Sequence, residues 1–188
     1  MGKIFVIFFT FIFLNFNTYA ENLIKHESNA DGSDTFDINF IFQSVHNVKK
    51  NFRLLTDFEN IHEFNPSAYK TEILSQDVDK LFLKTTFRDC VLFFCREMKM
   101  YEYIFSYCEN NNYCIISSEV IPKDDSPVIS GNTTWKIKNN SKTNKSMISY
   151  QSKFRAFLTL PPFIGDSIFK KTIQRNLKFL EEKINGLP

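Results

Sequence analysis

Residues 164–184 read IGDSIFKKTIQRNLKFLEEKI, and this stretch decides the fold that we expect. Its apolar residues recur at steps of three to five, with charged residues between them, which is the period of an amphipathic helix. These apolar residues are Ile164, Ile168, Ile173, Leu177, Leu180 and Ile184. Such a helix is stable only when its apolar stripe is covered, and an antiparallel sheet upstream is the obvious cover.

Strand-like segments fill most of the chain before this helix. Residues 35–43 alternate apolar and polar side chains at first, as a half-buried strand does. Residues 48–55 and 57–64 then follow a helical period and predict two short helices, the second ending before Asn65-Pro66. Polar or cysteine-bounded turns separate six further strands, which we place at 69–76, 80–88, 96–107, 113–120, 131–138 and 146–155. The sequence therefore predicts an α+β fold, with a curved seven-stranded antiparallel sheet wrapped on a long C-terminal helix.

The first twenty residues have the layout of a secretory signal peptide. Lys3 precedes an apolar run, and Thr18 and Ala20 place small residues three and one before Glu21. The apolar run is short for a membrane span, although an uncleaved anchor is the alternative. We expect a signal peptide over 1–20 that is cleaved near Ala20, a flexible leader over 21–34 and a single domain over 35–186. The cleaved chain would be periplasmic or secreted.

The charge of the chain argues against a nucleic-acid function. The sequence has 23 Lys and Arg residues and 21 Asp and Glu residues, so it has neither a net basic field nor an acidic excess. Its five Gly and six Pro exclude a collagen-like or low-complexity chain. Six of the 22 Phe lie in the first twenty residues, so only the positions of the remaining Phe bear on function.

Four cysteines, Cys90, Cys95, Cys108 and Cys114, lie within one short part of the chain. An even number in an exported protein favours disulfides over a metal site, and the three His lie upstream with no ligand-like spacing. A turn between Cys108 and Cys114 would bring these two together across a hairpin. A Cys90–Cys95 bond requires the four apolar residues between them to form a loop, because residues five apart on one strand point to opposite faces. We expect the disulfides Cys90–Cys95 and Cys108–Cys114, with crossed pairing and reduced thiols as the alternatives. We expect no metal and no cofactor.

The whole order of elements resembles the helix-grip fold of the START-like, or SRPBCC, superfamily. This superfamily includes polyketide cyclase, coenzyme-Q-binding and lipid-transfer members. The local residues agree at 55–59 with 64–66, at 131–137 with 146–150, and at 161–165. The last of these opens the C-terminal helix as in exported bacterial relatives, and the resemblance covers about residues 35–184.

The resemblance implies an apolar cavity between sheet and helix, and the alternation of side chains predicts its lining. We expect aromatic and aliphatic residues from one face of the third, fifth and sixth of the six later strands and from the helix. The candidate lining residues are Tyr101, Tyr103, Phe105, Trp135, Ile137, Ile148, Tyr150, Phe154, Ile168, Ile173 and Leu177. A core filled by these side chains is the alternative.

Three connections should meet at one end of the sheet, because successive turns of a meander alternate between its two ends. They are the turn at 90–95, the connection at 121–130 and the exit at 156–163. Two of them are unusually apolar, and clustered exposed apolar side chains mark binding or membrane-contact sites. We expect them to form the rim of the cavity mouth, with a seal over the barrel end as the alternative. The rim residues are Val91, Leu92, Phe93, Phe94, Phe157, Leu158, Leu160 and Phe163.

No catalytic motif is present: the chain lacks a G-x-S-x-G elbow, a Gly-rich phosphate loop and H-E-x-x-H. We therefore expect a non-enzymatic carrier or sensor of a hydrophobic molecule such as a lipid or quinone, with no catalytic residue. We also expect a monomer that makes transient membrane contact and binds no nucleic acid. A cyclase- or hydrolase-like enzyme using the same cavity and an interaction domain with a solid core are the alternatives.

Overall fold

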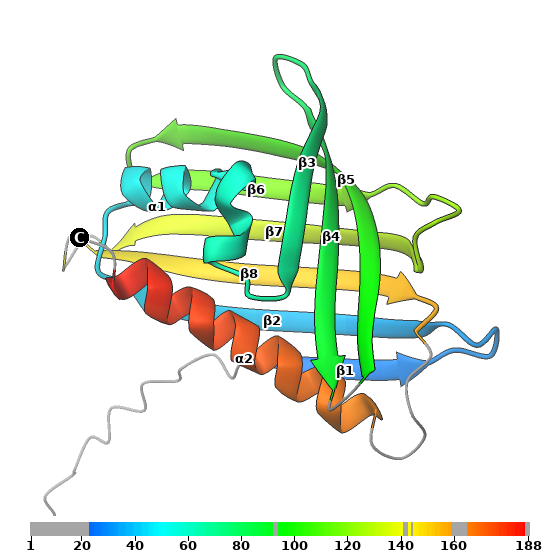
Figure 1. Cartoon of the computed structure of the whole chain (residues 1–188). Helices are drawn as coiled ribbons and strands as arrows, with labels where there is room; N and C mark the ends of the chain where they lie inside the picture. The colour runs from blue at the N-terminus through cyan, green and yellow to red at the C-terminus, as the bar shows by residue number, and fades with distance from the viewer. Residues whose placement is uncertain (1–22, 92–93, 141–142, 144, 159–164, 187–188) are drawn as a thin grey trace, which may run out of the picture.

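The computed structural model describes residues 23–91, 94–140, 143, 145–158 and 165–186 (Figure 1). In this part, eight strands form one antiparallel sheet in the order β1-β2-β8-β7-β6-β5-β4-β3. The strands are β1 (Leu23–Ser28), β2 (Asp34–Ser44), β3 (Ala68–Gln76), β4 (Leu81–Val91), β5 (Phe94–Asn110), β6 (Tyr113–Val120), β7 (Val128–Asn140) and β8 (Lys145–Ala156). The helices are α1 (Val48–Leu55), the short 3-10 helix η1 (Phe58–Glu63) and α2 (Gly165–Gly186). The predicted sheet, the two short helices and the long C-terminal helix are confirmed.

The eighth strand, β1, corrects the flexible leader that we expected over 21–34. Its sequence LIKHES has no alternation of apolar and polar residues, so the two-residue period gave no sign of it. β1 is instead held by its pairing with β2 from Leu23 opposite Asn39 to Ser28 opposite Asp34. Gly32, with φ of 82°, supplies the left-handed backbone position in the turn between the two strands.

One end of the space under α2 is a filled hydrophobic core. The side chains of β2 alternate as predicted, and Phe40 and Phe42 point inward to meet Ile137 and Ile148. The last turns of α2 cover this cluster through Ile184, which like Ile137 and Ile148 is fully buried. Helix α1 closes the side of the cluster with Val48, Phe52, Leu54 and Leu55. Phe40, Phe42, Ile137, Ile148 and Ile184 do not border the cavity that lies further along α2.

The two cysteine pairs lie on neighbouring hairpins. Cys108 and Cys114 form a disulfide across the β5–β6 hairpin, as the sequence predicted. In the β4–β5 hairpin the strands continue to Val91 and Phe94. The loop is therefore shorter than the four residues between Cys90 and Cys95 that we expected to form it. The backbone of Cys90 is the direct register partner of Cys95, but the side chains of residues 89–96 lie outside the described part. The Cys90–Cys95 disulfide therefore stays a prediction.

The sheet curves so strongly that β3 and β4 run across the direction of β7 and β8 (Figure 1). β5 takes part in both directions, pairing with β4 along its first half and with β6 along its second half. Helix α2 crosses the inner face, with its C-terminal end near α1 and its N-terminal end near the ends of β1 and β4 (Figure 1). The chain therefore surrounds a space that only part of the core fills.

Candidate ligand cavity

An apolar cavity of about 520 Å³ lies between the sheet and α2. Its walls come from α1, η1, strands β2 and β4 to β8, and the length of α2 from Gly165 to Leu180. Most lining side chains are aliphatic, aromatic or Met, including Leu83, Ile104 and Ile116. The cavity continues from the filled core, so the inner face of one sheet carries both a solid and a hollow region.

Six of the expected lining residues lie on the wall of this cavity. Trp135 comes from β7, and Tyr150 and Phe154 come from β8. The other three, Ile168, Ile173 and Leu177, come from α2. The rings of Trp135 and Tyr150 pack with centroids 4.3 Å apart, which fixes both on the same wall. Ile137 and Ile148 share the inward faces of β7 and β8, but they lie in the filled core and not on the cavity.

The expected face of β5 is wrong. Tyr101, Tyr103 and Phe105 lie on the outer face of the sheet, and Phe105 is 39% exposed. Lys80 covers part of this outer surface, with Nζ 3.3 Å from the centroid of the Tyr103 ring. The opposite side chains of β5 line the cavity: Met98, Met100, Glu102 and Ile104. Both faces of the strand carry apolar side chains, so hydrophobicity alone could not choose between them.

A row of polar side chains crosses the inner face of the sheet and was missed from the sequence. Ser118 on β6 is the register partner of Thr133 on β7, which in turn is the partner of Ser152 on β8. The hydroxyl oxygens of Thr133 and Ser152 are 2.9 Å apart. At the β5 end of the row, the Ser118 hydroxyl donates to Oε1 of Glu102 over 2.6 Å. The only sequence signal was a hydroxyl residue at an inward position of three consecutive strands.

Glu102 is the most unusual member of this row, because its carboxyl is buried in an apolar surround. Its register partners are Leu83 on β4 and Val120 on β6. Burial raises the pKa of Glu102 above its ordinary value, and the hydrogen bond from Ser118 opposes this shift only in part. Burial also raises the pKa of Tyr150, and the nearby Glu102 adds to that shift. The site thus favours the uncharged form of both groups.

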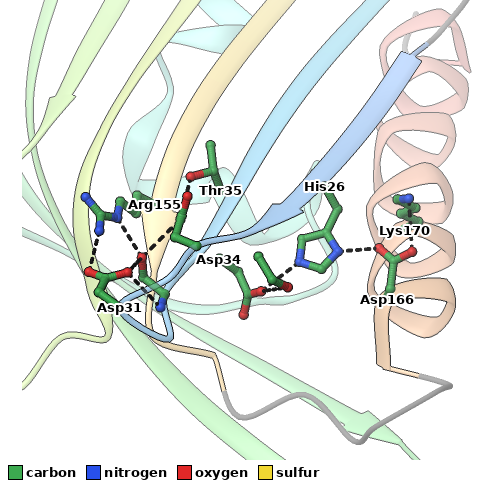
Figure 2. Close-up of polar contacts among 10 residues, drawn as sticks. His26, Asp31, Asp34, Thr35, Arg155, Asp166 and Lys170 are labelled. Atoms are coloured by element: carbon green, nitrogen blue, oxygen red, sulfur yellow. Dashed lines mark hydrogen bonds and ion pairs between the residues drawn. The ribbon is translucent and has the colours of Figure 1, made fainter.

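The N-terminal end of α2 is held over the cavity by a polar cluster (Figure 2). Nε2 of His26, on β1, lies 2.8 Å from Asp34, and Nδ1 lies 2.8 Å from Asp166 in the first turn of α2. Asp166 also pairs with Lys170 one turn later. The His26 ring stacks on Phe36, whose ring centroid is 4.2 Å from that of Phe169 on α2. We call His26, Asp34 and Asp166 the helix clamp.

The rim is described only in part. Residues 92, 93, 160 and 163 and the side chains of Val91 and Phe94 lie outside the described part of the chain. Phe157 is 46% exposed, whereas Leu158 next to it lines the cavity. The amide of Phe157 donates to Pro127 over 2.8 Å, so the exit of β8 meets the β6–β7 connection at one end, as strand parity predicted. The rim therefore stays a prediction beyond these two residues.

The described residues contain no group of three or more His, Cys, Asp or Glu residues arranged to hold a metal ion. Within the same ranges, no helix is both long and apolar enough to cross a membrane.

Comparison with known proteins gives a likeness in structure alone. No family model matches the sequence, and no curated protein matches it. Human STARD10 superposes with a TM-score of 0.64 at 10% identity, covering 86% of this chain and 72% of STARD10. A STAR-related lipid transfer protein from Xanthomonas axonopodis gives 0.59 at 10% identity, covering 86% and 98%. The Zhui aromatase/cyclase from Streptomyces sp. R1128 gives 0.63 at 11% identity, covering 81% and 92%. The chain therefore has the START-like helix-grip fold, which lipid-transfer proteins and aromatase/cyclases share.

Proposed function

We propose that this protein binds a hydrophobic small molecule in the cavity between its sheet and α2. The observation that carries the proposal is the cavity itself, whose volume of about 520 Å³ falls within the roughly 300–1,000 Å³ typical of small-molecule sites. A mostly apolar lining with a few polar groups is also typical of such sites. Among the proteins that share the fold, three are named for lipid transfer, which supports a lipid-like ligand.

The proposed direct test is to identify what the protein carries. Native mass spectrometry of the purified chain, followed by organic extraction, should reveal a bound apolar molecule. Thr172→Trp should lower the occupancy, because Thr172 lines the cavity and the larger ring would fill it. Gln174→Trp is the matched control, because Gln174 is exposed on the same helix. A protein that never carries or takes up an apolar molecule would contradict the proposal, and chemical change of an added ligand would favour the enzymatic alternative.

We also propose that the chain is exported. The layout of residues 1–20 and the Cys108–Cys114 disulfide support this, because disulfides persist in oxidising compartments. N-terminal sequencing of the mature protein should begin at or near Glu21, and the protein should be found in the extracytoplasmic fraction. A chain that keeps Met1 and stays with the cytoplasm would contradict this proposal.

A membrane is the proposed place of loading. Phe157 is exposed beside Leu158, which lines the cavity, so an apolar surface continues from the outside into the wall. Phe157→Asp should weaken binding to phosphatidylcholine vesicles and leave the melting temperature nearly unchanged. Phe105→Asp is the control, because Phe105 is a similarly exposed aromatic on the outer face of the sheet. Equal binding by both variants and the unmodified protein would argue against contact through this end.

A further inference from the structure

The polar groups of the cavity restrict which apolar molecules it can accept. The described lining contains no Lys, Arg or His, so a ligand with a carboxylate or phosphate inside the cavity would meet no positive charge. Burying an unpaired charge in an apolar site is costly. An anionic headgroup is therefore unsuited to the described interior.

Glu102 marks where a polar group of the ligand would lie. This residue is 8% exposed and lines the cavity, and no Lys, Arg or His forms an ion pair with it in the described part. The Ser118 hydroxyl donates a hydrogen bond to Oε1 of this carboxyl. A carboxyl group kept un-ionised has an O–H that can donate to an oxygen in the cavity.

The neighbouring groups agree with a neutral partner for Glu102. Ser118, Thr133 and Ser152 continue from it in one row across three strands, and all three are uncharged hydroxyls. Tyr150 adds a phenol, and the hydroxyls of Ser152 and Thr133 partly oppose the rise in its pKa. Beyond this row most of the wall is apolar, with residues such as Ile116 and Trp135, and a smaller number of polar residues, among them Asp57, Asn132 and Asn176, also border the cavity. A molecule with one polar end and a long apolar body would match this distribution.

We propose that the cavity selects neutral, mostly apolar molecules that carry a hydrogen-bond-accepting oxygen, such as an ester or ketone, and that the un-ionised carboxyl of Glu102 donates to this oxygen. The inference rests on the proposed function and names the ligand class for the same cavity. Ser118 is a positioning residue in this arrangement, because its hydroxyl holds the carboxyl that contacts the ligand.

The test uses four probes of equal chain length: methyl laurate, laurate, dodecylammonium and dodecane. Each is titrated against the full chain carrying Nile red, and displacement of the dye gives the affinity. Methyl laurate should bind more tightly than laurate or dodecylammonium. Its advantage over dodecane should be about threefold to tenfold, the effect of one net hydrogen bond.

Two variants separate recognition by Glu102 from a general effect on the fold. Glu102→Leu should weaken methyl laurate binding by about the same threefold to tenfold and leave dodecane binding unchanged. Glu102→Gln should keep most of the methyl laurate affinity, because the amide N–H₂ also donates. Glu119→Leu is the matched control, since Glu119 is exposed on β6. Melting temperatures of all variants establish that each one folds.

The outcomes distinguish this inference from the proposed function. Tighter binding of laurate than of methyl laurate would overturn the inference and leave hydrophobic ligand binding intact. Tighter binding of dodecylammonium, lost in Glu102→Gln, would have the same meaning. Equal affinity for methyl laurate and dodecane in the unmodified protein would do the same. Failure of all four probes to bind would overturn the proposed function and the inference together.

Discussion

The two ends of α2 cover the same sheet in different ways. Toward its C-terminus, Leu180 and Ile184 pack into the filled core with Ile137 and Ile148. Toward its N-terminus, the helix lies over the cavity and is held by the polar contacts of the helix clamp. The difference indicates that the filled end supplies most of the packing energy, whereas the hollow end gives up packing to leave space for a ligand. Substitutions at the two ends should therefore have unequal effects.

The largest difference is expected between Ile148→Ala and Ile173→Ala. Ile148 is fully buried in the filled core, so its truncation should lower the free energy of unfolding by about 2–5 kcal/mol. Ile173 already borders the cavity and is only half-buried, so the same change should cost less than about 2 kcal/mol. Urea denaturation of both variants measures this, and equal losses would mean that the two ends are packed alike.

A second effect, expected to be of about 1–3 kcal/mol, concerns a polar network beside the filled core. Asn51 is fully buried, accepts a hydrogen bond from Ser44 and donates to Ser146 and to the carbonyl of His46. Asn51→Ala should destabilise the protein because it leaves these buried groups without partners. Asn39→Ala, on the outer side of β2, serves as the control in the same denaturation series. A loss of stability no larger than that of the control would show that this network does not stabilise the filled end.

The helix clamp gives a smaller and more local prediction. His26→Leu removes the contacts to Asp34 and Asp166 but keeps an apolar side chain against Phe36, with an expected loss on the order of 1–2 kcal/mol. Amide hydrogen exchange should become faster in the first turns of α2 and stay unchanged in its last turns. His62→Leu, at an exposed position of η1, is the control. Faster exchange along the entire helix would show that its two ends are not independent.

A last effect should come from Glu102 and depends on pH. Because burial raises its pKa, the folded protein keeps the proton over a range above the ordinary value of about 4.5, where the unfolded chain releases it. Glu102 therefore lowers stability as pH rises through this range, by about 1.4 kcal/mol for each unit by which the pKa is raised. Glu102→Gln should become increasingly more stable than the unmodified protein over the same range. Urea denaturation at several pH values checks this, and parallel stability curves would contradict it.

Sequence patterns predicted the frame of the fold because its strands and helices have regular periods. The alternation in β2 and the helical period of α2 are clear signals, and the turn between Cys108 and Cys114 located a disulfide. β1 was not predicted, because its sequence has no alternation of apolar and polar residues and the strand is held by its pairing and by His26. Its role depends on Asp34 and Asp166, which only the folded chain brings together.

The site was less predictable than the fold. On β7, β8 and α2 the apolar face was assigned to the inside, and six of its expected residues border the cavity, whereas Ile137 and Ile148 lie in the filled core. On β5 the aromatic face of Tyr101 and Tyr103 appeared the better lining, yet the inner face is the one that carries Glu102. A buried carboxyl contradicts the ordinary rule that charged residues lie outside. The residue that breaks this rule is the one on which the proposed ligand selectivity depends.

The helix clamp also has a consequence for the time at which the protein becomes able to hold a ligand. His26 lies on the first described strand and Asp166 on the last helix. The second edge of β2 stays unpaired until β8 has formed beside it. Contacts between such distant parts of a chain form slowly, because a long loop has to close before they can form. The β1–β2 hairpin can form early, whereas the cavity acquires its cover only after the end of the chain has arrived. We therefore expect ligand uptake during refolding to follow, and not precede, the docking of α2.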